Sequence, residues 1–237
     1  MITPKRKSYK NFIYIYRYEK FFYQEGYRLI AGVDEAGRGC LAGPIVTAAV
    51  ILPKNFKIEF IDDSKKISAK LREELYERII KEAIEVQTVF ISAEEIDKSN
   101  VYQATISSMK KVISQFENKP DHVLVDAMPI YNFHCESSPI VRGDIKSVSI
   151  MAAAIVAKVT RDRYMAEMEN YYPGFQFSKH KGYGTNEHLQ ELQIHGVTPI
   201  HRLSFGPCQL RSKYVQMSFL DFDQSIWGES EPNLKKA

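Results

Sequence analysis

The sequence predicts an α/β fold because segments of strand character and segments of helix character alternate along most of the chain. Short apolar runs bounded by glycine, proline or polar residues have the length and composition of strands. Longer segments between them carry apolar residues at helical spacing behind polar capping residues. The chain has 237 residues, 44% of them hydrophobic, so we expect a substantial core in one large domain, with or without an appendage.

The first half of the chain is predicted to hold three strands and two helices. Two apolar runs flank a loop with three glycines, which indicates a strand, an irregular loop and a second strand. A polar stretch ending in Pro120 stops the second helix. In order, the elements are a strand over 29–33, a strand over 45–52, a helix from the N-cap Ser68 to about Glu85, a strand over 86–91 and a helix over 99–117.

The second half begins with a short buried strand over 122–126. A long helix over about 147–164 contains four alanines, and such small residues let a helix lie close against a sheet. A further helix, capped by Thr185, ends near His195. From Gly206 onward the pattern weakens, and the end of the chain is predicted to be partly disordered.

The N-terminal segment is basic and rich in aromatic residues. Residues 1–28 carry seven lysines or arginines against two glutamates, although the formal net charge of the whole chain is only +3. Aromatic and basic side chains together can bind single-stranded nucleic acid by stacking and phosphate neutralisation. The alternative is a helix over about 14–25 that packs its aromatic side onto the domain. We favour the packed helix.

Several residue patterns exclude common types of site. Three cysteines without a C-x-x-C pair are too few for a disulfide framework or a zinc site, and they fit a reducing cytosol. Four of the six histidines lie between residues 180 and 201 without zinc-site spacing, so we expect them on the surface or facing phosphate. Lys158, Arg161 and Arg163 are expected to form a solvated cationic face.

No segment of the sequence has the length of a membrane span. The longest apolar runs, over 45–52 and 150–157, fall far short of the ~20 residues that a transmembrane helix needs. The basic N-terminus does not continue into the apolar region of a signal peptide. We therefore expect a cytoplasmic protein that acts without a membrane.

Four carboxylates stand out by their positions. Asp34 and Glu35 follow the first strand, Asp126 ends the strand over 122–126, and Asp144 lies just ahead of the long helix. Ligands of open α/β sheets bind beyond strand ends, so these side chains can converge if the strands are neighbours. Carboxylate oxygens select Mg²⁺ or Mn²⁺ over softer metals, and two such ions ~3.5–4 Å apart promote phosphodiester hydrolysis.

The glycine loop allows two other interpretations. The acidic pair could be a solvated strand end and the glycines a simple hairpin turn. A dinucleotide site is disfavoured, because the spacing G-x-G-x-x-x-G is one residue too long and a strand follows it. Adjacent residues of a strand point to opposite faces, so we expect Glu35 to sit where the strand breaks.

Six motifs of the sequence are GVDEAGRGCLAGPIVTAAVIL at 32–52, DSKKIS at 63–68, VLVDA at 123–127, GDIKSVSIMAAAIVAKVTRD at 143–162, HKGYGT at 180–185 and HRLSF at 201–205. Together they resemble the motifs of the ribonuclease HII family, and the resemblance extends over residues 25–205. It implies a ribonuclease H-like fold, with a mixed central sheet flanked by helices and a C-terminal helical part. Residues 1–24 and 206–237 lie outside the resemblance, and there we expect a basic aromatic extension and a partly disordered tail.

The resemblance also implies an activity and its cofactor. The expected enzyme is an endoribonuclease that cuts the RNA strand of RNA–DNA hybrids and cuts at single ribonucleotides in duplex DNA, leaving 3′-hydroxyl and 5′-phosphate ends. It would use Mg²⁺ or Mn²⁺, with two ions when substrate is bound, and we expect it to act as a monomer. The implied catalytic and metal-binding residues are Asp34, Glu35, Asp126 and Asp144.

The same resemblance assigns residues to substrate binding. The backbone of Gly37, Arg38 and Gly39 would sense the ribose 2′-hydroxyl, the group that distinguishes RNA from DNA. Tyr183 would stack on the sugar at the junction, and Lys65 would contact the substrate. Two positions depart from the usual pattern. Cys40 replaces a proline, and Leu203 replaces a residue that is commonly basic, which puts one phosphate contact in doubt.

Two other functions remain as alternatives. A non-catalytic nucleic-acid-binding module would gain from losing carboxylates that repel phosphate, so four retained carboxylates argue against it. A related metal nuclease could cut another substrate, such as a junction. The glycine loop together with Tyr183 favours ribonucleotide recognition instead.

Overall fold

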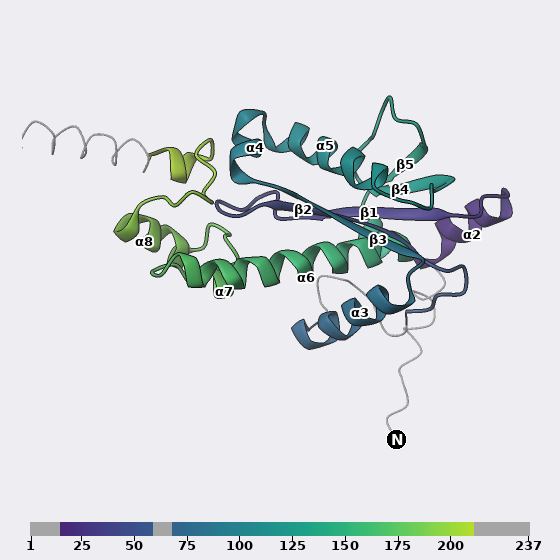
Figure 1. Ribbon diagram of the computed structural model, residues 1–237, viewed down its shortest axis with the longest axis horizontal. Helices are drawn as coiled ribbons and strands as arrows, with labels where there is room; N and C mark the ends of the chain where they lie inside the picture. Colours follow the sequence, from purple (N-terminus) through teal and green to yellow (C-terminus); the bar gives the residue numbers. More distant parts are fainter. Residues whose placement is uncertain (1–14, 59–67, 211–237) are drawn as a thin grey trace, which may run out of the picture.

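The computed structural model describes residues 15–58 and 68–210 (Figure 1). Strands and helices alternate along this part of the chain, as predicted. Its helices include none that is both long enough and apolar enough to span a membrane. The elements are α2 (Arg17–Gln24), β1 (Ile30–Ala36), β2 (Ile45–Ile51), α3 (Ala69–Glu82), β3 (Glu85–Ile91), α4 (Ala93–Lys98), α5 (Val101–Ser114), β4 (His122–Asp126), β5 (Glu136–Ile140), η2 (Gly143–Ile145), α6 (Val148–Tyr171), α7 (Phe177–His180) and α8 (Asn186–His195).

The five strands form one mixed sheet in the order β3-β2-β1-β4-β5. β1 pairs antiparallel with β2, which pairs antiparallel with β3. On its other side β1 pairs parallel with β4, and β4 pairs parallel with β5. The predicted mixed sheet is therefore confirmed, and β1 and β4 are parallel neighbours at its centre.

One strand end was predicted wrongly, and one strand was not predicted. The strand expected over 29–33 runs on to Ala36, because Asp34 and Glu35 keep strand pairing with β2. β5 was not predicted, since its sequence ESSPI lacks apolar alternation and contains Pro139. β5 is the last strand of the sheet, and an edge strand tolerates a proline.

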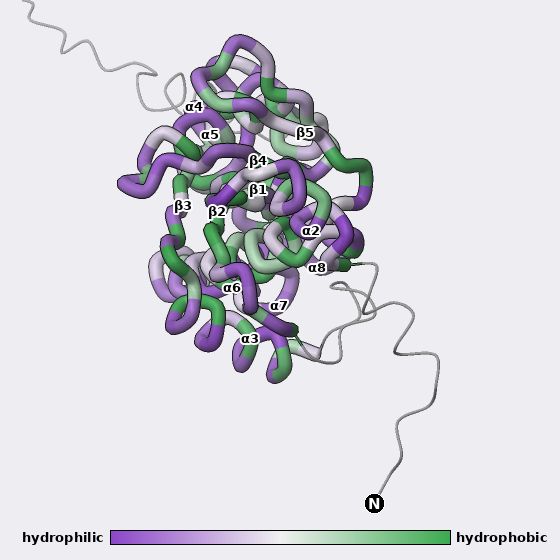
Figure 2. Tube along the Cα trace, turned by 90° about the vertical axis from the view of Figure 1, so that its right-hand side faces the viewer, coloured by the Kyte–Doolittle hydropathy of each residue, from purple (hydrophilic) through white to green (hydrophobic). Residues whose placement is uncertain are grey.

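Helices cover both faces of the sheet, as Figure 1 shows. α6 and α3 enclose a core with one face of β2, in which Ala152, Val156 and Ile79 are buried. α5 and α4 enclose a second core with the opposite face, around Met109 and Ile96. Figure 2 shows the apolar segments of the strands between these helix layers.

α6 lies close to β1 because residue 32 is glycine. A Cβ atom at Gly32 would lie 2.0 Å from the carbonyl carbon of Ser149, in the first turn of α6. That distance is far below any van der Waals contact, so a larger residue would push the helix away. α6 extends to Tyr171, seven residues beyond the predicted Tyr164.

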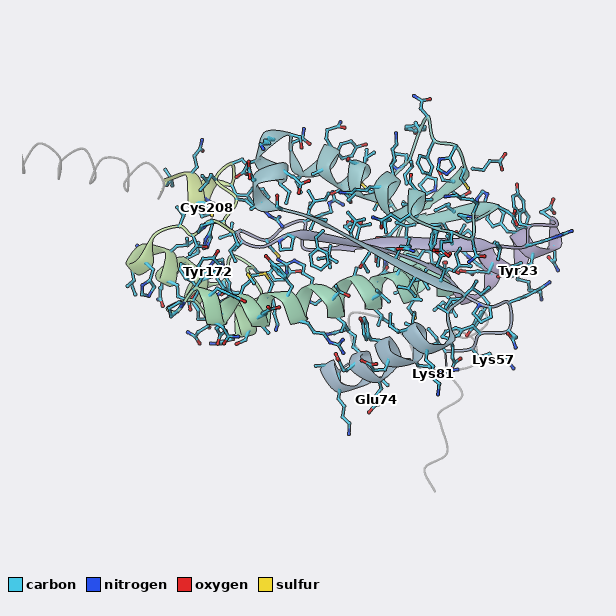
Figure 3. All side chains as sticks on the ribbon, viewed as in Figure 1. Tyr23, Lys57, Glu74, Lys81, Tyr172 and Cys208 are labelled. Atoms are coloured by element: carbon cyan, nitrogen blue, oxygen red, sulfur yellow. The ribbon has the colours of Figure 1, made fainter. Side chains whose placement is uncertain are left out.

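The N-terminal helix packs on the domain, which confirms the favoured interpretation. Phe22 stacks on His122 of β4, with ring centroids 3.9 Å apart. Tyr18 and Tyr23 pack against a small core that includes the buried Leu124 of β4. Glu19 is buried, with 4% of its surface exposed. Figure 3 shows Tyr23 at one end of the sheet and Cys208, in the C-terminal part, at the other.

The C-terminal part of the described chain is helical, as predicted. α7, α8 and a short helix over 206–210 follow α6. They share a small core in which Phe175, Phe177 and Leu192 are buried against Leu41 and Met165. This core brings the C-terminal segments into contact with the loop after β1.

Candidate active site

Asp34 and Asp126 come from the two central parallel strands. The last pair in the register of β1 and β4 joins Val33 to Val125, and each aspartate is the next residue of its strand. Parallel neighbours carry the side chains of such paired positions on the same side of the sheet. Asp34 is 7% exposed, so one carboxylate is buried beside the other at the strand ends.

Asp144 is brought to the same place by a turn after β5. The Gly143 amide donates a 2.6 Å hydrogen bond to Asp126 Oδ1. Arg142 adopts a left-handed conformation with φ of 58°, and η2 follows it. Because residue 143 is anchored to Asp126, the buried Asp144 lies beside the same strand end.

Glu35 does not break the strand, contrary to expectation. β1 continues to Ala36, and the break comes at Gly37, whose φ of +97° favours glycine. Glu35 and Asp34 both line a cavity of about 380 Å³, together with Asp144 and Lys158. The expected break at Glu35 lies two residues before the observed break at Gly37.

The carboxylates form a buried concentration of negative charge. Burial raises the pKa of Asp34 well above its ordinary value, and repulsion from Glu35, Asp126 and Asp144 raises it further. Burial also raises the pKa of Glu35, although the Arg38 guanidinium, 3.3 Å from the Glu35 carboxylate, opposes the shift. A bound cation would relieve both the desolvation and the repulsion.

The residues present fit a divalent ion of the hard type. The candidate ligands are carboxylate oxygens, which Mg²⁺ and Mn²⁺ prefer. Glu35 Oε2 is buried and finds no hydrogen-bond partner in the described part of the chain. Over residues 15–58 and 68–210, no three acidic, histidine or cysteine side chains already converge as closely as metal ligands do. An ion would therefore have to draw these carboxylates together.

Arg161 of α6 donates hydrogen bonds to the glycine loop after β1. The Arg161 side chain is fully buried, which contradicts the expected solvated face. It donates hydrogen bonds to the carbonyl oxygens of Pro44 (2.9 Å), Ala42 (3.0 Å) and Lys181 (2.8 Å). A Cβ atom at Gly37 would lie 2.1 Å from Arg161 Nε, so glycine is required there.

A second buried arginine holds the start of the loop. Arg202 is fully buried and donates to the carbonyl oxygens of Gly37 (2.7 Å), Arg38 (2.8 Å) and Gly43 (2.8 and 3.1 Å). HRLSF is recognisable from the sequence only as a motif, and no role for Arg202 is predicted from it. Because the partners of Arg202 are backbone carbonyl groups, no acidic residue in the sequence indicates that this arginine is buried.

The turn that carries Tyr183 is joined to the glycine loop. The Leu41 amide donates to the Gly182 carbonyl at 2.8 Å. Gly182 has φ of +80°, and a Cβ atom there would lie 2.3 Å from the Ala42 carbonyl oxygen. The two loops are therefore joined by a backbone hydrogen bond, and the contact requires glycine at position 182.

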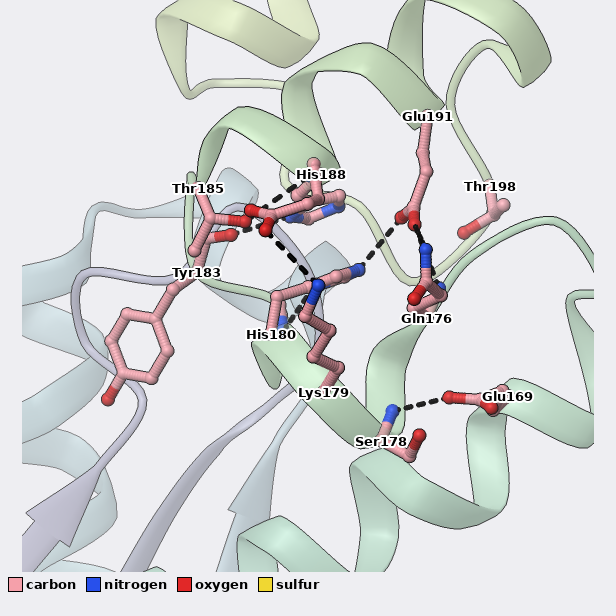
Figure 4. A network of polar contacts seen from close by, with 12 residues as sticks. Glu169, Gln176, Ser178, Lys179, His180, Tyr183, Thr185, His188, Glu191 and Thr198 are labelled. Carbon is pink, nitrogen blue, oxygen red and sulfur yellow. Dashed lines mark hydrogen bonds and ion pairs between the residues drawn. The ribbon is translucent and has the colours of Figure 1, made fainter.

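Tyr183 itself borders the cavity. Its side chain is 41% exposed and lines the cavity with Asp34 and Glu35. Lys158 Nζ lies 5.6 Å from the centre of the Tyr183 ring, and burial raises the pKa of the Tyr183 hydroxyl group. In Figure 4 the ring points away from the neighbouring histidines.

Three of the four clustered histidines are buried, so their expected surface position was wrong. His188 Nδ1 donates to the Tyr183 carbonyl (2.9 Å), and His188 Nε2 accepts from His201 Nε2 (3.0 Å). His201 Nδ1 accepts from the Thr198 amide at 2.9 Å. His180 bonds to Glu191 at 2.8 Å, as Figure 4 shows. These rings support the turn that carries Tyr183.

The remaining predicted site residue cannot be placed. Lys65 lies in residues 59–67, outside the described residues. Arg72, at the start of α3, lines the cavity with Lys158 and was not singled out from the sequence. It gives the cavity a second cationic side chain.

Comparison with solved structures identifies the fold. The ribonuclease H2 from Pyrococcus horikoshii OT3 has a TM-score of 0.68 at 23% identity and covers 79% of this chain and 99% of its own. Bst-RNase HIII in complex with Mn²⁺ has a TM-score of 0.60 at 14% identity, covering 82% of this chain and 72% of its own. The class of protein is therefore a ribonuclease H-like α/β protein, as predicted.

Comparison of sequences identifies the family. The family model of Ribonuclease HII matches residues 31–208. A ribonuclease HII of Enterococcus faecalis is 48% identical over 203 residues, which cover 86% of this chain and 79% of that relative. The chain belongs to the ribonuclease HII family. It is a metal-dependent endoribonuclease that cleaves the RNA strand of RNA–DNA hybrids.

Proposed function

We propose that Asp34, Glu35, Asp126 and Asp144 are the catalytic carboxylates and bind Mg²⁺ or Mn²⁺, two ions when substrate is present. The observation that carries this proposal is the burial of Asp34, whose pKa is raised by burial and by the other three carboxylates. When bound, such ions activate a water and stabilise the attacking and leaving oxygens of phosphodiester hydrolysis.

The chain's own residues prepare the cavity for a phosphate backbone. Arg38 pairs with Glu35, which lines the cavity. Lys158 and Arg72 line the same cavity and add positive charge beside the carboxylates. They would attract the anionic substrate and orient the phosphate next to the ions.

We propose that ribose is recognised by the Gly37-Arg38-Gly39 loop and Tyr183. A Cβ atom at Gly39 would meet no described atom within 4 Å, so packing within the described part of the chain does not require this glycine. The open space would let a sugar approach the backbone. The partly exposed Tyr183 ring could then stack on the sugar at the junction, and cleavage would extend to single ribonucleotides in duplex DNA, leaving 3′-hydroxyl and 5′-phosphate ends.

We also propose domain bounds, an oligomeric state and a location for the chain. We assign the catalytic domain to residues 25–205, with residues 1–24 and 206–237 as appended segments. We propose that the chain acts as a monomer in the cytoplasm on RNA–DNA hybrids and on duplex DNA that contains ribonucleotides. Lys65 is retained as a proposed substrate contact.

The test is cleavage of duplex DNA carrying one ribonucleotide, with Mg²⁺, with Mn²⁺ and with EDTA. We expect cleavage by the unaltered chain with either ion and none with EDTA. Asp126→Asn should abolish cleavage, whereas Glu94→Gln, which changes an acid paired with Lys98 on the exposed surface, should not. Cleavage in EDTA or undiminished turnover by Asp126→Asn would contradict the proposal, and binding without cleavage under every condition would favour a binding module.

A further inference from the structure

We propose that Arg202 determines the preference for ribose by aiming the backbone amides of Arg38 and Gly39 at the substrate. Arg202 would be a positioning residue, because its side chain is buried beneath the loop and acts through the loop backbone. This inference rests on the proposed recognition of ribose by the glycine loop.

The first step concerns the geometry of the peptide groups. No peptide bond in the described residues is cis, and in a trans peptide group the N–H and C=O point in opposite directions. Gly37 C=O shares a peptide group with the Arg38 amide, and Arg38 C=O shares one with the Gly39 amide. Because Arg202 binds both carbonyl oxygens, at 2.7 and 2.8 Å, both N–H groups are turned away from the buried guanidinium.

The second step concerns the availability of these amides. Among the backbone hydrogen bonds of the described residues, neither the Arg38 nor the Gly39 amide donates to another protein group. A Cβ atom at Gly39 would meet no described atom within 4 Å, so the backbone of Gly39 is open on that side. Two successive donors that face outward beside the carboxylate site suit a ribose 2′-hydroxyl oxygen.

The contacts at position 202 require an arginine. The planar guanidinium group of arginine presents five donors in a fixed fork, which lets one side chain bind the carbonyl oxygens of Gly37, Arg38 and Gly43 together. The positive charge also polarises the peptide groups it binds and strengthens their N–H donors. Arg202 is itself anchored, because its amide donates to the Leu41 carbonyl at 2.9 Å. A lysine has a single flexible ammonium group and could not hold all three carbonyls.

Arg161 provides a matched control. It is as deeply buried as Arg202 and donates hydrogen bonds to the carbonyl oxygens of Ala42, Pro44 and Lys181. It does not bind the carbonyls of Gly37 or Arg38. If bracing the loop as a whole were enough for ribose preference, replacing either arginine would have the same effect.

The experiment measures affinity for duplex DNA with one ribonucleotide and for the all-DNA duplex of the same sequence, with Ca²⁺ in place of Mg²⁺. The preference for ribose is the dissociation constant of the all-DNA duplex divided by that of the ribonucleotide duplex. In Arg202→Lys we expect this ratio to fall by about tenfold, as for one lost hydrogen bond, with all-DNA affinity unchanged. Arg161→Lys should keep the wild-type ratio. Circular dichroism and the melting temperature establish that each variant is folded.

Each other outcome would overturn the inference. A folded Arg202→Lys variant with the wild-type ratio would remove Arg202 from this role while leaving the proposed function intact. An equal fall of the ratio in Arg161→Lys would show that both arginines act only by stabilising the loop. If the wild-type chain showed no preference for ribose, the proposed recognition itself would fail.

A measurement on the unaltered chain guards against a variant that does not fold. Backbone amide resonances of the full chain can be followed by NMR as the ribonucleotide duplex and the all-DNA duplex are added. We expect the Arg38 and Gly39 amides to shift downfield with the ribonucleotide duplex only. Identical shifts with both duplexes would contradict the inference.

Discussion

Asp34 and Asp126 are the residues that follow the paired Val33 and Val125 on two adjacent parallel strands. This relationship places two carboxylates side by side at the end of the sheet, where Asp34 is buried. Without a cation, such an arrangement lowers stability, since burial and like charge both disfavour the ionised form. This loss of stability can be measured by comparing the wild type with a variant that lacks one of the carboxylates.

Asp34→Asn should stabilise the metal-free protein at pH 7 while cleavage falls by about 10³-fold or more, since metal-bound groups contribute several kcal/mol to such reactions. The pKa of Asp34 is raised above its ordinary value of 3.8, so the folded state loses stability as the pH rises from 3.8 towards the raised pKa. The amide carries no charge and escapes this loss. Thermal unfolding in EDTA, where each kcal/mol is worth ~2–4 °C at this size, measures the gain.

The pH dependence provides the control for Asp34→Asn. The stabilisation should shrink as the pH falls towards 4, because Asp34 of the wild type is then protonated in both folded and unfolded states. Saturating Mn²⁺ should raise the melting temperature of the wild type more than that of the variant. A variant less stable than the wild type in EDTA at pH 7 would contradict the account.

Tyr183→Ala should reduce cleavage at a single embedded ribonucleotide. The ring borders the carboxylate cavity and is partly exposed, and loss of aromatic stacking on a nucleotide costs about 1–3 kcal/mol. Tyr183→Phe keeps the ring and removes only the hydroxyl group, so it should retain most activity. Steady-state rates on one substrate compare the three proteins, and full activity of Tyr183→Ala would remove the residue from its proposed role.

His201 should make the fold sensitive to acid. Burial lowers the pKa of His201 from 6.5 to about 3, so its contribution to stability is complete above pH 6.5 and is lost as the pH falls towards 3. In His201→Asn the amide oxygen can accept from the Thr198 amide, but the bond to His188 is lost, at a cost of about 1–3 kcal/mol at pH 7.

Urea unfolding between pH 5 and pH 7.5 measures this effect. The free energy of unfolding should depend less steeply on pH below 6.5 in His201→Asn than in the wild type. His195→Asn, which replaces an exposed histidine, serves as the control and should keep the wild-type slope. An unchanged slope in His201→Asn would show that the buried network does not titrate as described.

Glu19 should stabilise the protein through its hydrogen bonds and not through its charge. Its carboxylate accepts bonds from the Ser147 hydroxyl and, at 3.0 Å, from the Ser149 amide at the start of α6. Burial raises its pKa. Glu19→Gln keeps an acceptor without the buried charge and should be at least as stable at pH 7, whereas Glu19→Ala should lose about 1–2 kcal/mol. Chemical unfolding, with Glu25→Ala as an exposed control, separates these outcomes, and equal loss in both Glu19 variants would refute the interpretation.

Much of the fold could be predicted because local patterns agreed with the tertiary structure. The strands β2 and β4 are apolar runs with clear ends, and Ser68 caps α3 as expected, accepting from the Leu71 amide at 3.2 Å. β5 could not be predicted, because its pairing with β4 is made by the backbone and its side chains lack a pattern. The length of α6 was underestimated, since its charged second half includes the buried Arg161.

The candidate site was predictable to the extent that its residues stand at strand ends. Asp34 and Asp126 could be located from the apolar runs before them, and their roles remain predictions. Arg161 and Arg202 could not be found in the same way. Their partners are carbonyl groups of a distant loop, and only the folded chain reveals that a charge on a helix or in a loop is buried.

The central claim is that the four carboxylates bind divalent ions at the end of the sheet. Anomalous scattering from crystals of the full chain soaked in Mn²⁺ tests it most directly. We predict a Mn²⁺ peak coordinated by Asp34 together with at least two of Glu35, Asp126 and Asp144. A peak elsewhere, with none between these carboxylates at saturating Mn²⁺, would contradict the account.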